Sequence, residues 1–184
     1  MINEIINMIQ KKKRVKGSCI VAIDGRCGSG KTTVAKILSD YFDCNVFHAD
    51  DFYIPFEKRA EDTLGNVDCE RLTEEVLKPL GEGMSFSYKP FLCMDGIFGE
   101  SINVRHTDVA IIEGSYCCQE SLFDFYDMHI FVDVNKNVQQ QRLCEREGEA
   151  KLKRFNNKWI PMEERYFATT ELKYKCEIYY KTSV

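Results

Sequence analysis

Short, almost wholly apolar runs recur along the chain and are separated by segments with helical spacing. The runs fall at 19–24, 45–49, 109–112 and 128–132. Their length and their content of β-branched residues are typical of strands that are buried on both faces. A further edge strand is expected over 177–180. The pattern therefore predicts a sheet of short strands that is covered on both sides.

Segments with helical periodicity lie before and after these predicted strands. Ile2, Ile5, Ile6 and Ile9 recur at i, i+3, i+4 and i+7 and form one apolar stripe. We expect helices over the ranges 2–14, 31–42, 68–80, 136–147 and 161–175. Strands that alternate with helices predict an α/β fold, with a parallel β-sheet flanked by helices and joined by right-handed crossovers. The chain shows no repeat or linker, so residues 1–184 are expected to form a single domain.

The turn after the first strand carries the most specific motif. It reads Gly25-Arg26-Cys27-Gly28-Ser29-Gly30-Lys31-Thr32, which matches G-x-x-x-x-G-K-[ST] between a predicted strand and a predicted helix. Glycines let such a loop turn its N–H groups toward phosphate oxygens, and the following helix presents its positive end to the same anion. We therefore expect Gly25 through Thr33 to bind a nucleotide, with Lys31 on the β- and γ-phosphates and Thr32 on Mg²⁺.

Several predicted strands end in an acidic residue: Asp24, Asp50, Glu113 and Asp133. In parallel α/β sheets, ligands bind outside the carboxyl ends of the strands. We therefore expect these acids to gather at one edge, where a metal ion or a reacting hydroxyl could meet them. His48, His106 and His129 have no companion at metal-ligand spacing, and they are interpreted as packing or surface residues.

Charge and cysteine content indicate which binding partners and which cellular compartment to expect. The net charge of −4 argues against a general nucleic-acid binder, and no apolar run has the length needed to span a membrane. The segment before Gly17 lacks the order of a secretion signal. The nine cysteines include no C-x-x-C pair, which favours structural thiols in a reducing cytoplasm. A redox role for Cys27, beside Lys31, is the less favoured alternative to a small side chain at a variable loop position.

The kind of nucleotide protein follows from further motifs. The chain lacks the N-K-x-D signature of guanine-binding proteins, because its Asn135-Lys136 pair continues as Asn137-Val138 and its Asn157-Lys158 pair as Trp159-Ile160. The phosphate loop, together with 48–53 (His-Ala-Asp-Asp-Phe-Tyr) and 111–116 (Ile-Ile-Glu-Gly-Ser-Tyr), resembles the uridine kinase and phosphoribulokinase group of P-loop kinases. Residues 159–167 are similar to bacterial proteins described as uridine kinase-like. The resemblance implies the P-loop NTPase fold with a helical lid, expected here over 142–158.

The resemblance also implies transfer of the γ-phosphoryl group of ATP to a hydroxyl. It assigns Asp50 as the base that also lies near Mg²⁺, and Glu113 as a second acid that holds the metal with Thr32. Arg142 and Arg146 lie four residues apart and match the lid arginines that stabilise transferring charge, although a solvated helix face is the alternative for each. Lys31 completes the expected catalytic set.

The acceptor is the least determined part of this hypothesis. Tyr53 and Asp50 are expected at the acceptor, with Asp68 on ribose hydroxyls and Tyr88 or Phe91 stacked on a base. Uridine or cytidine is the favoured acceptor. Leu92 stands where an acid is expected in uridine kinases, so another small alcohol (pantothenate, glycerate or a sugar phosphate) and a non-catalytic ATP-binding regulator stay open. A homo-oligomer is compatible with the sequence.

Overall fold

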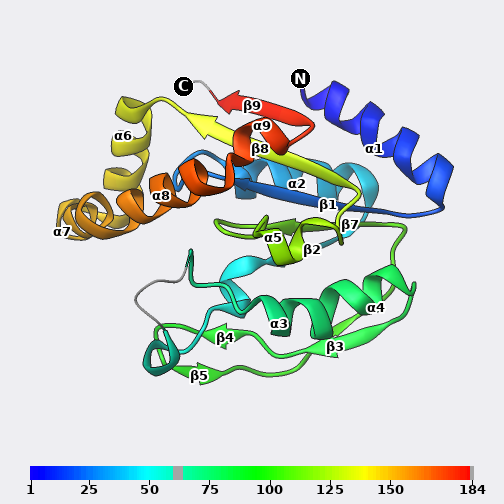
Figure 1. The fold of residues 1–184 in the computed structure, drawn as a ribbon. Helices are drawn as coiled ribbons and strands as arrows, with labels where there is room; N and C mark the ends of the chain where they lie inside the picture. Colours follow the sequence, from blue (N-terminus) through cyan, green and yellow to red (C-terminus); the bar gives the residue numbers. More distant parts are fainter. Residues whose placement is uncertain (60–63, 183–184) are drawn as a thin grey trace.

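The computed structural model describes residues 1–59 and 64–182. A central parallel sheet organises this part of the chain, with strand order β2-β7-β1-β8-β9 (Figure 1). Its strands are β1 (Cys19–Gly25), β2 (Asn45–His48), β7 (Val109–Glu113), β8 (Met128–Val134) and β9 (Ile178–Thr182). Each neighbouring pair runs parallel, which confirms the predicted α/β architecture.

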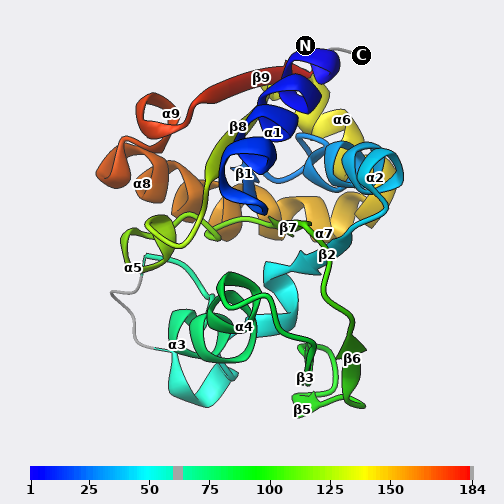
Figure 2. The same ribbon diagram turned by 90° about the vertical axis from the view of Figure 1, so that its right-hand side faces the viewer.

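Helices cover both faces of the sheet (Figures 1 and 2). One face carries α1 (Ile2–Lys16) and α2 (Lys31–Phe42), which pack on alternate residues of β1 such as Val21 and Ile23. The opposite face packs around Ile20 and Ala22 of the same strand. It is covered by α3 (Cys69–Leu72), α5 (Glu120–Phe123), α8 (Ile160–Thr170) and α9 (Leu172–Lys175). Side chains that alternate along β1 thus enter two separate cores, as the unbroken apolar strand predicts.

Two of the expected helices continue through π-helical turns. The segment predicted over 68–80 is α3, the π-helical η3 (Thr73–Leu77) and α4 (Lys78–Gly81). Near the C-terminus, α6 (Lys136–Glu147) ends at Gly148, which adopts φ 81°. From there α7 (Glu149–Arg154), the π-helical η4 (Phe155–Trp159) and α8 follow one another without an intervening loop. The predicted lid, 142–158, is therefore helical on both sides of Gly148, and its part from 149 to 158 is directly continuous with α8.

The segments without a clear period fold apart from the central sheet. They contain η1 (Ala49–Phe52) and η2 (Phe56–Lys58), which are single 3₁₀ turns. Two antiparallel pairs follow: β3 (Phe86–Tyr88) with β6 (Ile102–Val104), and β4 (Phe91–Leu92) with β5 (Ile97–Phe98). Such short strands give too few alternations to be seen in the sequence.

The topology places the predicted phosphate loop at the middle of the sheet. Strand β1 lies between β7 and β8, so the turn after Gly25 opens at the centre of the carboxyl edge. Gly25 itself has φ 135°, and a Cβ there would lie 2.0 Å from the carbonyl oxygen of Val132. Only glycine fits this close approach to β8. Along the described part of the chain, no helix combines the length and apolar character required to cross a membrane.

Candidate functional site

The phosphate loop runs from the end of β1 into the first turn of α2. Gly30 precedes the helix with φ 95°, a conformation that favours glycine. The Lys31 side chain is 9% exposed and turns back over the loop. Its Nζ donates hydrogen bonds to the carbonyl oxygens of Gly25 (2.7 Å) and Arg26 (3.0 Å) and to Ser115 Oγ (3.2 Å). The ammonium group is thus held inside the loop, where the motif predicts phosphates to bind.

The end of β7 provides a carboxylate next to this loop. The Thr32 hydroxyl donates to Glu113 Oε1 over 2.9 Å, and His48 Nδ1 lies 2.7 Å from the same oxygen. Burial opposes ionisation of Glu113, but the hydrogen bonds from His48 and Thr32 outweigh it and lower the pKa of the carboxyl. The bond to Glu113 in turn raises the pKa of His48. His48 was interpreted from the sequence as a packing or surface residue, and its side chain is 48% exposed; it touches the site through Glu113.

Asp50 enters the site from a different element than the sequence suggested. Strand β2 ends at His48, so Asp50 and Asp51 belong to the 3₁₀ turn η1 and not to the strand. Asp50 and Tyr53 line the cavity that the loop also borders. Asp51 instead accepts a hydrogen bond from Tyr88 Oη over 3.1 Å, and burial raises the pKa of its carboxyl. The two neighbouring acids thus have separate surroundings, and only Asp50 borders the cavity.

Asp24 does not join the expected row of acids at the edge of the sheet. It is fully buried, and its two oxygens accept from the amides of Gly25, Tyr116 and Cys118 and from Tyr166 Oη. Burial raises the pKa of Asp24 to about 6. With Cys117 and Cys118 it forms a group of metal-type ligand atoms within 4.8 Å. Because four donors already occupy the lone pairs of the Asp24 carboxylate, we interpret this cluster as structural and not as a metal site.

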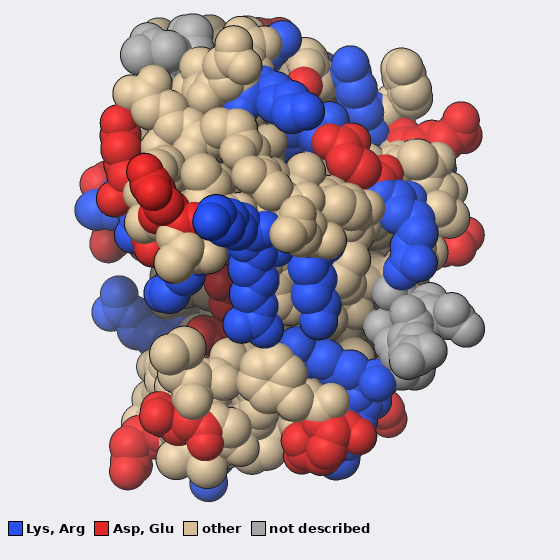
Figure 3. Space-filling model, turned by 90° about the vertical axis from the view of Figure 1, so that its left-hand side faces the viewer, with Lys and Arg blue, Asp and Glu red and all other residues tan. Residues whose placement is uncertain are grey.

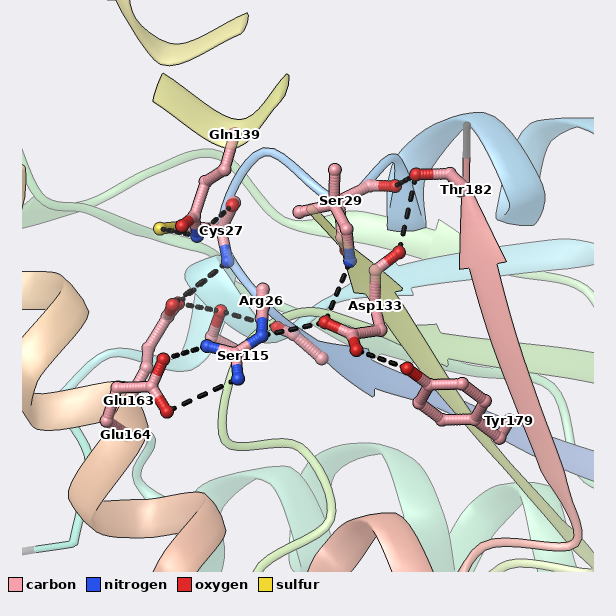
Figure 4. Close-up of polar contacts among 12 residues, drawn as sticks. Arg26, Cys27, Ser29, Ser115, Asp133, Gln139, Glu163, Glu164, Tyr179 and Thr182 are labelled. Carbon is pink, nitrogen blue, oxygen red and sulfur yellow. Dashed lines mark hydrogen bonds and ion pairs between the residues drawn. The ribbon is translucent and has the colours of Figure 1, made fainter. Parts of the chain in front are cut away.

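Asp133 also departs from the expected row. Its carboxylate pairs with Arg26 Nε over 2.7 Å and accepts a hydrogen bond from Tyr179 Oη. Arg26 also pairs with Glu164, so both ends of its guanidinium are held by acids (Figure 4). Arg26 was expected to bind the nucleotide through the loop, and its side chain has a structural role in addition. Of the four strand-end acids, Asp50 and Glu113 remain at the cavity.

A cavity of about 1180 Å³ connects these groups with the predicted lid. Figure 3 shows lysine and arginine side chains gathered across this face of the molecule, beside a recess. The cations that line the cavity are Lys31, Arg59, Arg142, Arg146, Lys151, Arg154 and Lys181. The acids that line it are Asp50, Glu113, Glu147 and Glu163. A chain whose net charge is −4 therefore has a cavity with an excess of positive groups, which suits a polyanionic ligand.

The two predicted lid arginines make different contacts. Arg142 Nη1 donates to the carbonyl oxygens of Gly28 (3.2 Å) and Ser29 (3.4 Å) and to Thr182 Oγ1 (3.0 Å). It thereby ties α6 to the phosphate loop. Arg146 pairs with its neighbour Glu147 over 2.8 Å and borders the cavity. Lys151 and Arg154 of α7 extend the same lining.

Cys27 does not have the surroundings of a reactive thiol. Burial and the nearby Glu163 carboxylate raise the pKa of its thiol, and Gln139 Nε2 approaches the sulfur to 3.4 Å. Lys31 opposes this shift without reversing it. The favoured interpretation, a small side chain tolerated in the loop, agrees with these surroundings, and the redox hypothesis does not.

The predicted nucleoside contacts lie away from the cavity lining. Asp68 is the N-cap of α3 and accepts from the amide of Arg71 over 3.1 Å. Tyr88 is buried with its ring stacked on Phe52, and Phe91 is 4% exposed with its ring against Phe98. One oxygen of Asp68 caps a helix and the two rings pack against other rings, so each residue already has a partner in the fold. Their contact with a nucleoside stays a prediction.

Other residues in the lining had no role assigned from the sequence. Ser115 and Glu163 contact the phosphate loop, and Arg59 borders the cavity. Ser115 and Glu163 fall inside motifs that carried the family resemblance, but no spacing rule distinguishes them there. Only their position in the fold reveals their surroundings.

Comparison with known proteins bears on these assignments. No family model matches the chain. Uridine kinase from Clostridium botulinum (strain Langeland) is 29% identical over 137 residues, which are 67% of this chain and 66% of that protein. Uridine kinase from Anoxybacillus flavithermus is 26% identical over 141 residues, 67% of this chain and 64% of that protein. The chain is similar to uridine kinases.

The fold of the chain is also similar to that of a solved structure. The structure of a possible uridine kinase from Bacillus stearothermophilus covers 96% of this chain and 99% of its own, with a TM-score of 0.66 at 20% identity. The predicted P-loop fold and the resemblance to uridine kinase-like proteins are confirmed. The chain matches slightly less than two thirds of the length of either curated relative.

Proposed function

We propose that this chain is an ATP- and Mg²⁺-dependent kinase that transfers the γ-phosphoryl group to a hydroxyl of a small molecule, with uridine or cytidine as the favoured acceptor. One observation carries the proposal: a carboxylate suited to act as base, Asp50, faces the same cavity as Glu113 and as Lys31 and Thr32 of the phosphate loop. The name uridine kinase, which the relatives carry, supports the choice of a nucleoside.

The donor set beside the loop fits Mg²⁺. Thr32 and Glu113 present oxygen atoms within 2.9 Å of each other, and the pKa of Glu113 is lowered by its hydrogen bonds despite burial. Hard oxygen ligands of this kind are those that Mg²⁺ binds in proteins. Thr32, Glu113 and Asp50 are the residues that would hold it. When bound, the ion neutralises charge on the phosphates.

The chain's own groups account for the rest of the transfer. Loop amides and Lys31 hold the phosphates. The oxygen of the acceptor hydroxyl bonds to the γ-phosphorus, and Asp50 accepts the proton that this hydroxyl loses. The bond from that phosphorus to the bridging oxygen breaks, and the electron pair leaves on ADP. Arg146, Lys151 and Arg154 border the cavity from the lid side and stabilise the spread of negative charge.

A kinase of another small alcohol is the second candidate, and Arg59 favours it. Arg59 borders the cavity, and its guanidinium lies over the Phe56 ring, 4.1 Å from the centroid. An arginine that lines the same cavity as the candidate base suits an acceptor that carries a carboxylate or phosphate, as pantothenate, glycerate and sugar phosphates do.

Steady-state assays with uridine, cytidine and these three anionic alcohols test both candidates. Turnover of a nucleoside that survives Arg59→Ala supports the first candidate. Turnover of an anionic alcohol, with a KM that rises in Arg59→Ala while the KM for ATP stays constant, supports the second. ATP binding without turnover of any hydroxyl would instead indicate a regulatory module. Lys36→Ala is the control, because Lys36 pairs with Asp40 on the exposed side of α2 and its side chain is 72% exposed.

A further inference from the structure

A buried carboxylate occupies part of the phosphate loop. Glu163 of α8 is 3% exposed. Its two oxygens lie 3.1 and 3.0 Å from the amide nitrogen of Cys27, which donates to them, and Oε1 also accepts from Ser115 Oγ over 2.7 Å (Figure 4). An acid from a distant helix thus holds an amide of the loop that is expected to bind an anionic ligand.

The position of this carboxylate marks one end of the loop. Ser115 Oγ, which donates to Glu163, lies 3.2 Å from Lys31 Nζ, so the acid is one hydroxyl away from the ammonium that reaches the β- and γ-phosphates. In the described residues no side chain accepts from the amides of Gly28, Gly30, Lys31 or Thr32. The loop therefore keeps amides open toward α2, while its opposite end already holds an anion.

Electrostatics makes Glu163 and a phosphoryl oxygen competitors for that end. A charge-assisted hydrogen bond to the Cys27 amide is favourable for either anion, but two like charges at one buried donor repel strongly. The neighbouring Glu164 differs, because it pairs with Arg26 and its side chain is 50% exposed. Because Glu164 pairs with Arg26 and not with a loop amide, we do not expect an anion that enters the loop to displace it.

Displacement of Glu163 would be transmitted to the lid. Helix α8 continues directly from η4 and α7, and α7 carries the cavity cations Lys151 and Arg154. Trp159 lies one helical turn before Glu163 on this continuous segment and borders the same cavity. A shift of α8 at Glu163 therefore changes the surroundings of the lid cations and of Trp159.

We propose that Glu163 takes the place of the terminal phosphoryl group in the nucleotide-free chain, so that a nucleoside triphosphate displaces it and a diphosphate does not. The carboxylate is then the residue by which the loop distinguishes the two nucleotides and reports the third phosphate to the lid. This inference rests on the nucleotide binding in the proposed function, and it is independent of the acceptor.

Binding measurements on the full chain test the inference. Calorimetric titrations with Mg²⁺ and either ADP or a non-hydrolysable ATP analogue compare wild type, Glu163→Gln and the control Glu164→Gln. We expect Glu163→Gln to bind the analogue about tenfold more tightly and ADP unchanged, because only the triphosphate competes with the charge. Glu164→Gln should leave the ratio of the two affinities as in wild type. Equal weakening of both nucleotides, or weaker binding of the analogue alone, would overturn the proposal.

A measurement on the unaltered chain does not depend on the variant folding. Trp159 is the one tryptophan of the sequence, so its emission reports on the lid segment. We expect the ATP analogue to change this emission and saturating ADP to leave it as in the free chain. An equal change with both nucleotides would contradict the displacement of Glu163. A chain that binds both nucleotides as expected but phosphorylates no hydroxyl refutes the proposed function alone, and one that binds neither refutes both.

Discussion

The hydroxyl of Thr32 donates a hydrogen bond of 2.9 Å to Glu113, which joins the end of the phosphate loop to the end of β7. These two oxygens are the proposed ligands of Mg²⁺, and Glu113 brings the charge. Glu113→Gln removes that charge with little change of shape. We expect the Mg²⁺ concentration for half-maximal turnover to rise by roughly tenfold or more, because even outer ligands affect metal affinity on that scale.

Titration of turnover with Mg²⁺ at fixed ATP measures this effect. Asp40→Asn is a suitable control, since Asp40 pairs with Lys36 on the exposed side of α2. An unchanged Mg²⁺ requirement in Glu113→Gln would remove Glu113 from the metal site.

Lys31→Ala should abolish turnover and weaken ATP binding by at least about tenfold, since a charged hydrogen bond to phosphate is lost. Calorimetry with ATP gives the affinity directly. Lys36→Ala serves as the control, because Lys36 lies on the same helix and its side chain is 72% exposed. ATP binding at the wild-type affinity in Lys31→Ala would show that the loop does not hold the nucleotide as proposed.

Asp50→Asn should separate binding from chemistry. The amide keeps the shape of the carboxylate but cannot accept a proton, so ATP should bind normally while turnover falls roughly 10²-fold or more. Asp51→Asn is the matched comparison, because Asp51 lies next in sequence but contacts Tyr88. Its turnover should stay near that of wild type while its unfolding midpoint falls. The base assignment fails if both variants lose turnover to the same degree.

Asp24 should make the stability of the chain depend on pH. Burial raises its pKa in the folded chain to about 6, from an ordinary value of 3.8. The folded state therefore holds this proton more tightly than the unfolded state. The stability that the protonated carboxyl contributes is complete below about pH 4 and is lost as pH rises through 6, by up to about 3 kcal/mol.

Urea unfolding of wild type and Asp24→Asn between pH 4 and 8 measures this contribution. The wild-type free energy of unfolding, relative to the variant, should fall from pH 4 to 6 and level off above 7. A difference that instead grows with rising pH would show that the four donors around the carboxylate outweigh its burial.

Local sequence determined the parts of the molecule in which adjacent residues cooperate. The run before Asp24 predicts a strand with both faces buried, and the glycines followed by Lys31 and Thr32 predict a helix that opens on an anion. The parallel sheet, the loop and the position of Asp50 near the ligand edge follow from these patterns. The segment 81–107 was not predictable, because strands as short as Phe91–Leu92 leave no periodicity to detect.

Partners that are distant in sequence were decided by the tertiary structure alone. Asp24 and Glu113 are both acids near the ends of apolar strands. Asp24 is fully buried and accepts hydrogen bonds from backbone amides, whereas Glu113 lines the cavity. Glu163 reaches Cys27 across 136 positions of sequence. Periodicity predicts on which face of its own helix or strand a side chain lies. The hydrogen bonds and ion pairs of that side chain depend on which other element packs against this face. The packing partner is fixed only when the whole chain folds.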